Sequence, residues 1–302
     1  MRLNRIIPMA CLVAVAGVSF YAQSGLAQQA ATGTPAAPEG KAARPPATGS
    51  AQVLDPRVQQ RAYDFAFPGN FRVAHVSLPY SVFVSSRVAK DKKSPLIIAL
   101  HGLRGDPNTL MRGNLLDLAE AGGYIVVAPA GYNPRGWYGI PWTIGPSAGA
   151  DLKADPAAIN DPRNLTQLSE KDVMDVLAMA RKEFNVDERR TYLMGHSMGG
   201  AGTLYLGSKY ASNWAAVAAT APAAQCMESD MESILAKLTM PVLVIQGDAD
   251  TVVPVENTRK WIAAMKDRKM DHKYNEIPGG DNGSVIATGM PDIFAFFNAH
   301  TK

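Results

Sequence analysis

The sequence predicts an α/β fold in which a mostly parallel central sheet carries helices on both faces. Short apolar runs alternate along the chain with segments of helical periodicity, which is the pattern of successive βαβ units. One run, residues 96–100 (Leu-Ile-Ile-Ala-Leu), is apolar throughout, as expected of a strand buried on both faces. The stretch 53–302, roughly 250 residues, is long enough for one such domain with a substantial core.

The N-terminal residues 1–27 have the composition of a signal peptide. Two arginines precede a mostly apolar run over 6–20, and small residues at 25–27 offer a cleavage site. The run is too short and too interrupted for a stable membrane span. Residues 28–52 are rich in Ala, Pro, Thr and Gly, so we expect a disordered tether. The sequence therefore predicts an exported protein, periplasmic or secreted, with its folded domain at 53–302.

Charge and cysteine content exclude several classes of function. The formal net charge of +3 falls to about zero for the domain alone, because four basic residues and one acidic residue lie in the first 52 residues. A near-neutral domain does not indicate a nucleic-acid partner, which needs a clustered basic face. Only Cys226 lies in the domain, so it has no partner for a disulfide within the chain. Neither metal-ligand spacing nor a nucleotide-binding glycine motif occurs, and we expect no cofactor.

The expected elements follow one another in the order of alternating strands and helices. In the first part they are an antiparallel strand pair at 72–78 and 80–85, buried strands at 96–100 and 124–128, and a helix at 110–121 capped by Asn108. A second helix is expected to open at Ser169, because Ser169 and Asp172 resemble a capping box. Strands are then expected at 190–194, 214–220, 241–246 and 273–277, with helices after 199, at 256–268, and from Pro291 to Phe297.

The most informative motif is Gly195-His196-Ser197-Met198-Gly199, which reads G-x-S-x-G. An apolar strand pattern precedes it and a small-residue helix pattern follows it. Strand, sharp turn and helix form the context of a nucleophile elbow, in which the turn lifts a serine hydroxyl above the sheet edge. Ser197 is therefore the candidate nucleophile.

Three motifs together resemble the α/β-hydrolases. They are His101-Gly-Leu-Arg-Gly105, Gly195 to Gly199, and Gly247-Asp-Ala-Asp250, in that chain order. The pattern is similar to exported bacterial esterases and predicted peptidases of the dienelactone hydrolase and prolyl oligopeptidase superfamily, over nearly all of 80–302. The resemblance implies an α/β-hydrolase fold and hydrolysis through an acylated serine, which needs no cofactor.

The expected chemistry assigns further roles. A tetrahedral intermediate needs fixed N–H donors, and the backbone N–H groups of Leu103 and Met198 are the candidate oxyanion hole. Asp250 follows the strand at 241–246 and is preferred as the orienting carboxylate. Asp248 is the alternative, with a turn hydrogen bond as its ordinary role.

The general base is missing from its expected place. The family pattern after the last strand resembles Gly-Gly-Asp-His, and this chain has Asn282 where the histidine stands. An amide has no basic nitrogen near neutral pH and cannot shuttle the proton. The other histidines are expected to be structural: His75, His101, His196, His272 and His300.

A loop of about 40 residues between Ala128 and Ser169 is long enough to indicate a function. It leaves the carboxyl end of a strand, beside the serine, and carries the aromatic residues Trp137, Tyr138 and Trp142. We expect these three, with His101, to line the substrate site, although the tryptophans are equally suited to anchoring the loop.

The sequence thus predicts a serine carboxylic-ester hydrolase of strongly reduced activity, with Ser197, Asp250 and Asn282 at the catalytic positions. Small or aromatic esters, including esters linked to carbohydrate, are the expected substrates. Asn282 is an inactivating substitution, natural or introduced, or it marks a pseudo-hydrolase that kept the pocket for binding a small ligand. A serine peptidase of the same superfamily is the other alternative, and the oligomeric state is not predicted.

Overall fold

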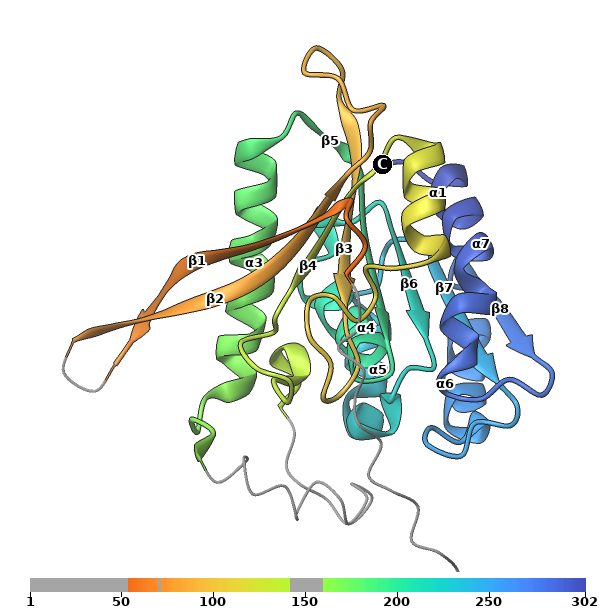
Figure 1. Cartoon of the computed structure of the whole chain (residues 1–302). Helices are drawn as coiled ribbons and strands as arrows, with labels where there is room; N and C mark the ends of the chain where they lie inside the picture. Colours follow the sequence, from red (N-terminus) through yellow and green to blue (C-terminus); the bar gives the residue numbers. More distant parts are fainter. Residues whose placement is uncertain (1–53, 70–71, 142–159) are drawn as a thin grey trace, which may run out of the picture. The chain divides into compact units, whose positions relative to one another are not determined.

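The computed structural model describes residues 54–69, 72–141 and 160–302 (Figure 1). Contacts between residues divide the chain into two units, Met1–Ser50 and Ala51–Lys302, and every described residue belongs to the second. The expected signal peptide, the tether and Trp142 lie outside the described residues.

An eight-stranded sheet in the order β1-β2-β4-β3-β5-β6-β7-β8 forms the centre of this unit. Its strands are β1 (Val58–Pro68), β2 (Val73–Val84), β3 (Ser94–Leu100), β4 (Ile125–Pro129), β5 (Val186–His196), β6 (Ala216–Thr220), β7 (Val242–Gly247) and β8 (His272–Ile277). Pairing is parallel from β4 to β8 and antiparallel at β1 and β2. The predicted mostly parallel sheet is confirmed.

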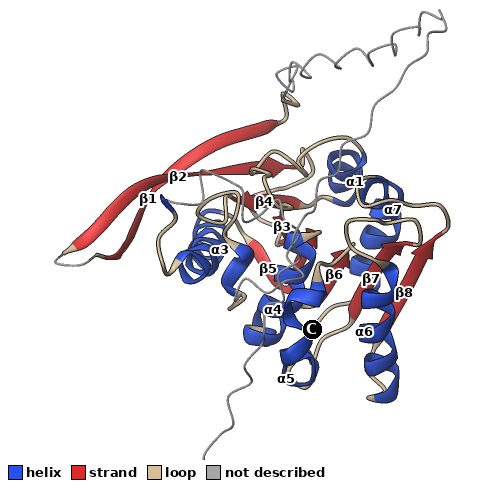
Figure 2. Ribbon diagram, turned by 90° about the horizontal axis from the view of Figure 1, so that it is seen from below, coloured by secondary structure: helices blue, strands red, loops and turns tan. Residues whose placement is uncertain are grey.

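Helices cover both faces of the sheet (Figure 2). They are α1 (Asn114–Gly122), α3 (Leu165–Glu183), α4 (Met198–Lys209), α5 (Met231–Leu235), α6 (Val255–Asp267) and α7 (Ser284–Ala299), with short 3-10 helices η1 (Trp137–Gly139), η3 (Ala211–Asn213) and η4 (Ala224–Asp230). Apolar side chains of α3, α4 and α6 pack in one core cluster, and those of α1 and α7 in another. The two clusters are separated by the sheet, which is why both faces of its central strands are apolar.

Strand β3 shows how the sequence produces this arrangement. Its residues Leu96, Ile98 and Leu100 belong to the α3–α4–α6 cluster, whereas Ile97 and Ala99 belong to the α1–α7 cluster. Because successive strand side chains point to opposite faces, only an uninterrupted apolar run can satisfy both clusters.

The predicted opening strand pair is wrong. Residues 73–84 form one continuous strand, β2, and its antiparallel partner is β1, which the sequence patterns did not indicate. Pro79 lies inside this strand. It is tolerated because β4 pairs with β2 only from Tyr80 onward, so Pro79 has a strand partner on one side alone.

Two predicted helix starts are also wrong, because the capping residues bond elsewhere. Helix α1 begins at Asn114 rather than 110, after Gly113 with its positive φ of 55°, and the side chain of Asn108 accepts a hydrogen bond from Ser81. Helix α3 begins at Leu165, so Ser169 and Asp172 lie inside it. Their side chains contact the loop that follows β4 instead of capping the helix.

The closing helix begins seven residues before Pro291, at Ser284, and the proline lies inside it. A proline within a helix leaves the carbonyl four residues earlier without its N–H donor. Here that carbonyl belongs to Ala287, and it accepts a hydrogen bond of 2.7 Å from the side-chain amide of Asn114 in α1. This contact between helices compensates for the lost bond and explains why the prediction of a helix start at Pro291 fails.

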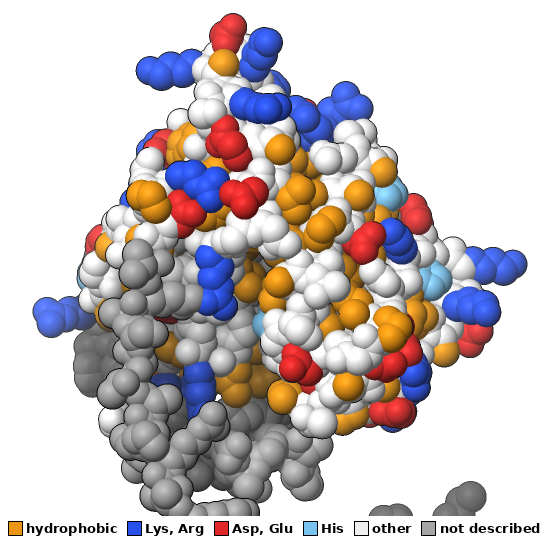
Figure 3. Space-filling model, turned by 45° about the vertical axis from the view of Figure 1, so that its right-hand side comes forward, with side chains coloured by type: hydrophobic (Ala, Val, Ile, Leu, Met, Phe, Trp, Pro, Cys, Tyr) orange, Lys and Arg blue, Asp and Glu red, His pale blue; other side chains and the backbone are white. Residues whose placement is uncertain are grey.

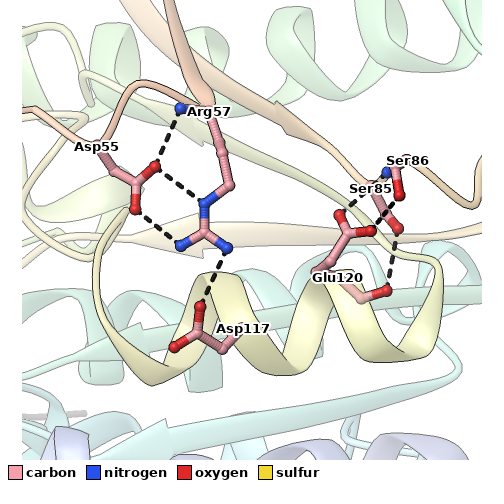
Figure 4. A network of polar contacts seen from close by, with 6 residues as sticks. All are labelled: Asp55, Arg57, Ser85, Ser86, Asp117 and Glu120. Atoms are coloured by element: carbon pink, nitrogen blue, oxygen red, sulfur yellow. Dashed lines mark hydrogen bonds and ion pairs between the residues drawn. The ribbon is translucent and has the colours of Figure 1, made fainter.

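Polar contacts attach the first strands to α1 (Figure 4). Arg57 binds the carboxylate of Asp55 through two nitrogens and donates a 3.0 Å bond to Asp117 of α1. These bonds lower the pKa of Asp55 to about 2. At the other end of α1, the Glu120 side chain accepts hydrogen bonds from the backbone and hydroxyl of Ser86. Exposed pairs of this kind contribute about 1 kcal/mol or less each, so their effect is to orient the elements.

On the face drawn in Figure 3, Lys and Arg side chains are interspersed with Asp and Glu, and apolar side chains lie between them. No helix within 54–69, 72–141 or 160–302 is both long and apolar enough to cross a bilayer.

Candidate active site

The parallel strands end at one edge of the sheet, and the predicted site residues follow those ends. Leu103 follows β3, Ser197 follows β5, Asp250 follows β7, and Asn282 follows β8. This is the edge at which α/β proteins bind ligands, because loops from adjacent parallel strands converge there.

Ser197 lies on the turn between β5 and α4 with φ 56° and ψ −113°. Residues other than glycine rarely adopt this backbone conformation, and such strain is typical of a nucleophile elbow. Its backbone is held from both sides: its N–H donates to Thr220 O at 2.9 Å, and its carbonyl accepts from the N–H of Ala201 and of Ala223. The predicted strand–turn–helix context of the serine is therefore present.

The flanking glycines are required by close packing. A Cβ at Gly195 would lie 2.2 Å from the carbonyl oxygen of Gly199, and one at Gly199 would lie 2.2 Å from that of Leu100 in β3. Real Cβ contacts are never so short, so any larger residue would displace backbone.

We expect Gly199→Ala to lower the free energy of unfolding by about 2 kcal/mol or more, since overpacking a tight site forces the backbone to shift. Urea unfolding followed by circular dichroism measures this. Gly283→Ala is the matched control, because a Cβ there meets only Asp281 Oδ1 at 3.7 Å and the residue has φ −79°. Equal stability of the two variants would contradict the close packing of the elbow against β3.

Asp250 is buried, with 5% of its surface exposed, and its carboxylate is fully hydrogen-bonded. One oxygen accepts the backbone N–H groups of Val252 and Val253, both at 2.8 Å. The other accepts the side-chain amides of Gln246 at 3.1 Å and Asn282 at 2.9 Å. Four donors fix the carboxylate rigidly, and Asn282 receives its orientation from this contact.

The alternative acid, Asp248, lies on the same loop but contacts a different group. Its exposed side chain accepts the backbone N–H of Gly279 at 2.6 Å, in the loop after β8. The structure thus brings Asp250, and not Asp248, to the side chain of Asn282. Asp248 holds the loop that precedes Asn282.

His196 lies close to Asp250 and Asn282. The sequence patterns did not indicate this proximity. Burial lowers its pKa to about 4, against the opposing effects of the Asp250 charge and a hydrogen bond with the Asn282 side chain. Its Nδ1 lies 3.4 Å from the hydroxyl of Thr220. The imidazole is neutral at pH 7, and a base of such low pKa removes a proton from a serine hydroxyl poorly.

The candidate oxyanion donors lie on the two sides of the elbow. The turn after β3 touches it, since a Cβ at Gly102 would lie 3.4 Å from Ser197 Cβ. Met198 is buried at the start of α4, and Leu103 is half-buried in the turn. Within the described part of the chain, no hydrogen-bond acceptor takes the backbone N–H of either residue. Two free N–H groups beside a serine suit an oxyanion, and the assignment stays a prediction.

The residues expected to line the substrate site are largely buried. His101 is 2% exposed, Tyr138 0% and Trp137 6%, and Trp142 lies outside the described residues. Both ring nitrogens of His101 face carbonyl oxygens, those of Gly102 at 2.8 Å and Ala130 at 2.9 Å. Burial lowers its pKa, so only one nitrogen of the neutral ring can donate. Burial gives His101, Trp137 and Tyr138 a packing role, and their contact with substrate stays a prediction.

The family described as "Putative esterase" matches residues 72–289, which is more than half of the chain. The chain belongs to this esterase family. Over 229 residues it is 26% identical to the bifunctional acetylxylan esterase/xylanase XynS20E of Neocallimastix patriciarum, a match that covers 73% of this chain and 29% of that protein. The esterase-family chain therefore spans less than a third of the length of this curated relative.

Solved structures of other proteins share this fold. An S-formylglutathione hydrolase from Agrobacterium tumefaciens superimposes with a TM-score of 0.60 at 16% identity, covering 84% of this chain and 99% of that one. A CE1 ferulic acid esterase from Anaeromyces mucronatus gives 0.55 at 18% identity, covering 79% and 89%. The α/β-hydrolase fold that the three motifs implied is confirmed.

Proposed function

We propose that the protein is a carboxylic-ester hydrolase that uses Ser197 as nucleophile, with greatly reduced activity because Asn282 occupies the position of the general base. The observation that carries this proposal is the 2.9 Å hydrogen bond from Asn282 to Asp250, on loops that follow β8 and β7. The histidine of an α/β-hydrolase belongs in that place, after the acid in chain order. Family membership and the strained serine support the same activity.

In the proposed reaction, Ser197 Oγ attacks the ester carbonyl and the developing oxyanion receives hydrogen bonds from the N–H groups of Leu103 and Met198. Collapse of the intermediate breaks the bond to the alcohol, which leaves, and forms an acyl-serine. Water then attacks the acyl-serine and releases the carboxylic acid. In each half-reaction a base must take a proton from the attacking hydroxyl and return it to the leaving oxygen. Asn282 cannot do this, so the proton must pass directly to and from solvent.

For substrate, we propose small or aromatic acyl groups, including those esterified to carbohydrate. The names of two relatives support this class: one is an acetylxylan esterase, named for a small acyl group on a carbohydrate, and the other is a ferulic acid esterase, named for an aromatic acid. An ester linked to a polysaccharide is too large to cross a membrane, so an exported protein, as expected from the signal peptide over residues 1–27, would suit it. A pseudo-hydrolase that binds such an ester without turning it over is the second candidate, and the amide of Asn282, which bonds Asp250 but has no basic nitrogen, favours it.

The nucleophile is tested most sharply where the base has been restored. We expect that adding Ser197→Ala to Asn282→His returns 4-nitrophenyl acetate hydrolysis to within a few-fold of the unmodified protein. The reason is that members of a triad act as a unit, so loss of the serine and loss of the base are not additive. A steady-state assay measures this, and mass spectrometry of the acid-quenched Asn282→His protein should detect an acylated peptide containing Ser197.

Ser208→Ala in the same background is the control, because Ser208 lies about three turns further along α4 and its hydroxyl bonds Tyr205 O. Unchanged hydrolysis after Ser197→Ala would exclude Ser197 as the nucleophile.

A further inference from the structure

A buried carboxylate that the proposed chemistry does not use lies in the middle of α3. Asp172 has no exposed surface, and three groups from two other segments donate to it. Its Oδ2 accepts the backbone N–H groups of Gly131 at 2.7 Å and Tyr132 at 3.2 Å, and its Oδ1 accepts the hydroxyl of Tyr63 in β1 at 2.6 Å. No Lys or Arg among the described residues forms an ion pair with it.

Burial raises the pKa of Asp172 to about 6, and the three hydrogen bonds limit the rise. At neutral pH the group is therefore an ionised carboxylate, which can only accept hydrogen bonds. A carboxylate without an ion pair is costly to bury unless donors satisfy it, and the loop after β4 supplies two of the three donors here.

The two N–H groups that Asp172 holds begin a strained loop, residues 130–140, between β4 and the undescribed segment. Three residues of the loop have positive φ values: 65° at Tyr132, 52° at Trp137 and 51° at Tyr138. These values lie in the left-handed region, which residues other than glycine rarely adopt. A second contact from α3 supports the loop one turn earlier, where the Ser169 hydroxyl accepts the backbone N–H of Tyr138 at 3.1 Å. Helix α3 thus fixes the loop at both ends.

The same loop contacts the turn that carries the candidate oxyanion donor. The Tyr138 hydroxyl donates to His101 O at 3.0 Å, and the backbone N–H of Arg104 donates to Pro134 O at 2.9 Å. The His101 ring meets Ala130 O at 2.9 Å. These three bonds attach residues 101 and 104, on either side of Leu103, to loop 130–140. The direction of the Leu103 N–H therefore depends on the position of that loop.

We propose that Asp172 is a positioning residue of the ester hydrolysis: by holding the N–H groups of Gly131 and Tyr132 it fixes loop 130–140, and through that loop the Leu103 N–H. The inference rests on the proposed function, because it assigns the Leu103 N–H to the oxyanion. The oxyanion exists only during reaction, so a displaced donor lowers kcat and leaves KM nearly unchanged.

The kinetic test uses the Asn282→His protein. Asp172→Ala removes the acceptor of both N–H groups, and we expect kcat to fall at least 10-fold with KM changed less than 3-fold. Asp172→Asn keeps an oxygen of the same size facing the loop, and we expect it to restore most of kcat. Asp175→Ala is the matched control, since Asp175 lies one turn further on α3 and pairs with Lys171 at the surface. A similar loss in the Asp175 and Asp172 variants, or no rescue by Asn, would overturn the proposal.

A second measurement does not depend on activity. Amide hydrogen exchange of the otherwise unmodified protein should become faster in peptides covering 101–105 and 131–138 after Asp172→Ala, with peptides of β6 and β7 unaffected. If Asp172→Ala unfolds the protein, Tyr138→Phe tests the next link, because it removes only the hydroxyl that holds His101 O and should accelerate exchange at 101–105 alone. Unchanged exchange at 101–105 in both variants would reject the coupling. An inactive Asn282→His protein with the expected exchange would instead reject the proposed function and keep the coupling.

Discussion

Asn282→His is expected to raise kcat/KM for a short-chain aryl ester by about 10²–10⁴-fold, the range that a positioned general base contributes. The acceptor for the new imidazole is already in place. Asp250 Oδ2 accepts the Asn282 amide at 2.9 Å, is held by Gln246 as well, and needs no movement to accept an imidazole N–H instead. That bond leaves the other ring nitrogen unprotonated, in the tautomer that a general base requires.

The pH dependence of the Asn282→His protein follows from the same contact. The Asp250 charge favours the protonated imidazole, so the pKa of the new histidine should lie at or above the ordinary value of about 6.5. Activity should therefore rise with pH through that pKa and level off above it, because only the neutral ring accepts a proton. The activity of the unmodified protein should show no such rise near neutral pH, since the pKa of His196 is about 4.

Asn282→Gln is the matched control for this gain, because it supplies an amide without a basic nitrogen. A folded Asn282→His protein that hydrolyses no ester faster than Asn282→Gln would leave the binding-only alternative as the better account. Thermal unfolding of all three proteins distinguishes this result from misfolding.

Asp250→Asn in the Asn282→His background is expected to remove most of the gain, lowering kcat by up to about 10²–10⁴-fold. An amide at this position can donate to the imidazole and so favours the wrong tautomer, which is the reason for losses of this size in serine hydrolases. In the unmodified protein the same change should alter the slow hydrolysis only a few-fold, because no imidazole depends on the carboxylate. Stopped-flow or steady-state assays of the four proteins form a double-mutant cycle.

Asp248→Asn provides the control for this cycle. Asp248 lies two residues away and bonds Gly279 rather than residue 282, so its loss should change kcat less than about 10-fold. If Asp248→Asn rather than Asp250→Asn abolished the gained activity, the choice of Asp250 as the orienting acid would be wrong.

The elements that the sequence predicted correctly depend on local signals. The apolar run 96–100 could only be a central strand, because both of its faces are covered. The glycines of the elbow predicted a sharp turn. In the structure, a Cβ added at either Gly195 or Gly199 would lie 2.2 Å from a backbone oxygen. The contact of Asp250 with Asn282 could also be expected, since both follow parallel strands that end at one edge.

The failed predictions share a different cause. Asn108, Ser169 and Asp172 have the residue types of helix caps, yet their polar atoms bond to segments distant in sequence. Pro291 lies inside a helix because the amide of Asn114 takes its orphaned carbonyl. A side chain satisfies whichever partner the folded chain brings near, and a pattern of neighbouring residues carries no information about that partner.

Local sequence patterns were enough to predict the sheet-and-helix architecture, the turn that carries Ser197 and the loops that carry Asp250 and Asn282, because periodicity and glycine stereochemistry act over a few residues. The contact of His196 with Asn282 and the hold of Asp172 on the loop beside the Leu103 turn became visible in the folded chain alone. Such contacts join segments tens of residues apart, and burial sets the pKa values of the groups involved, so both arise only once the chain has packed.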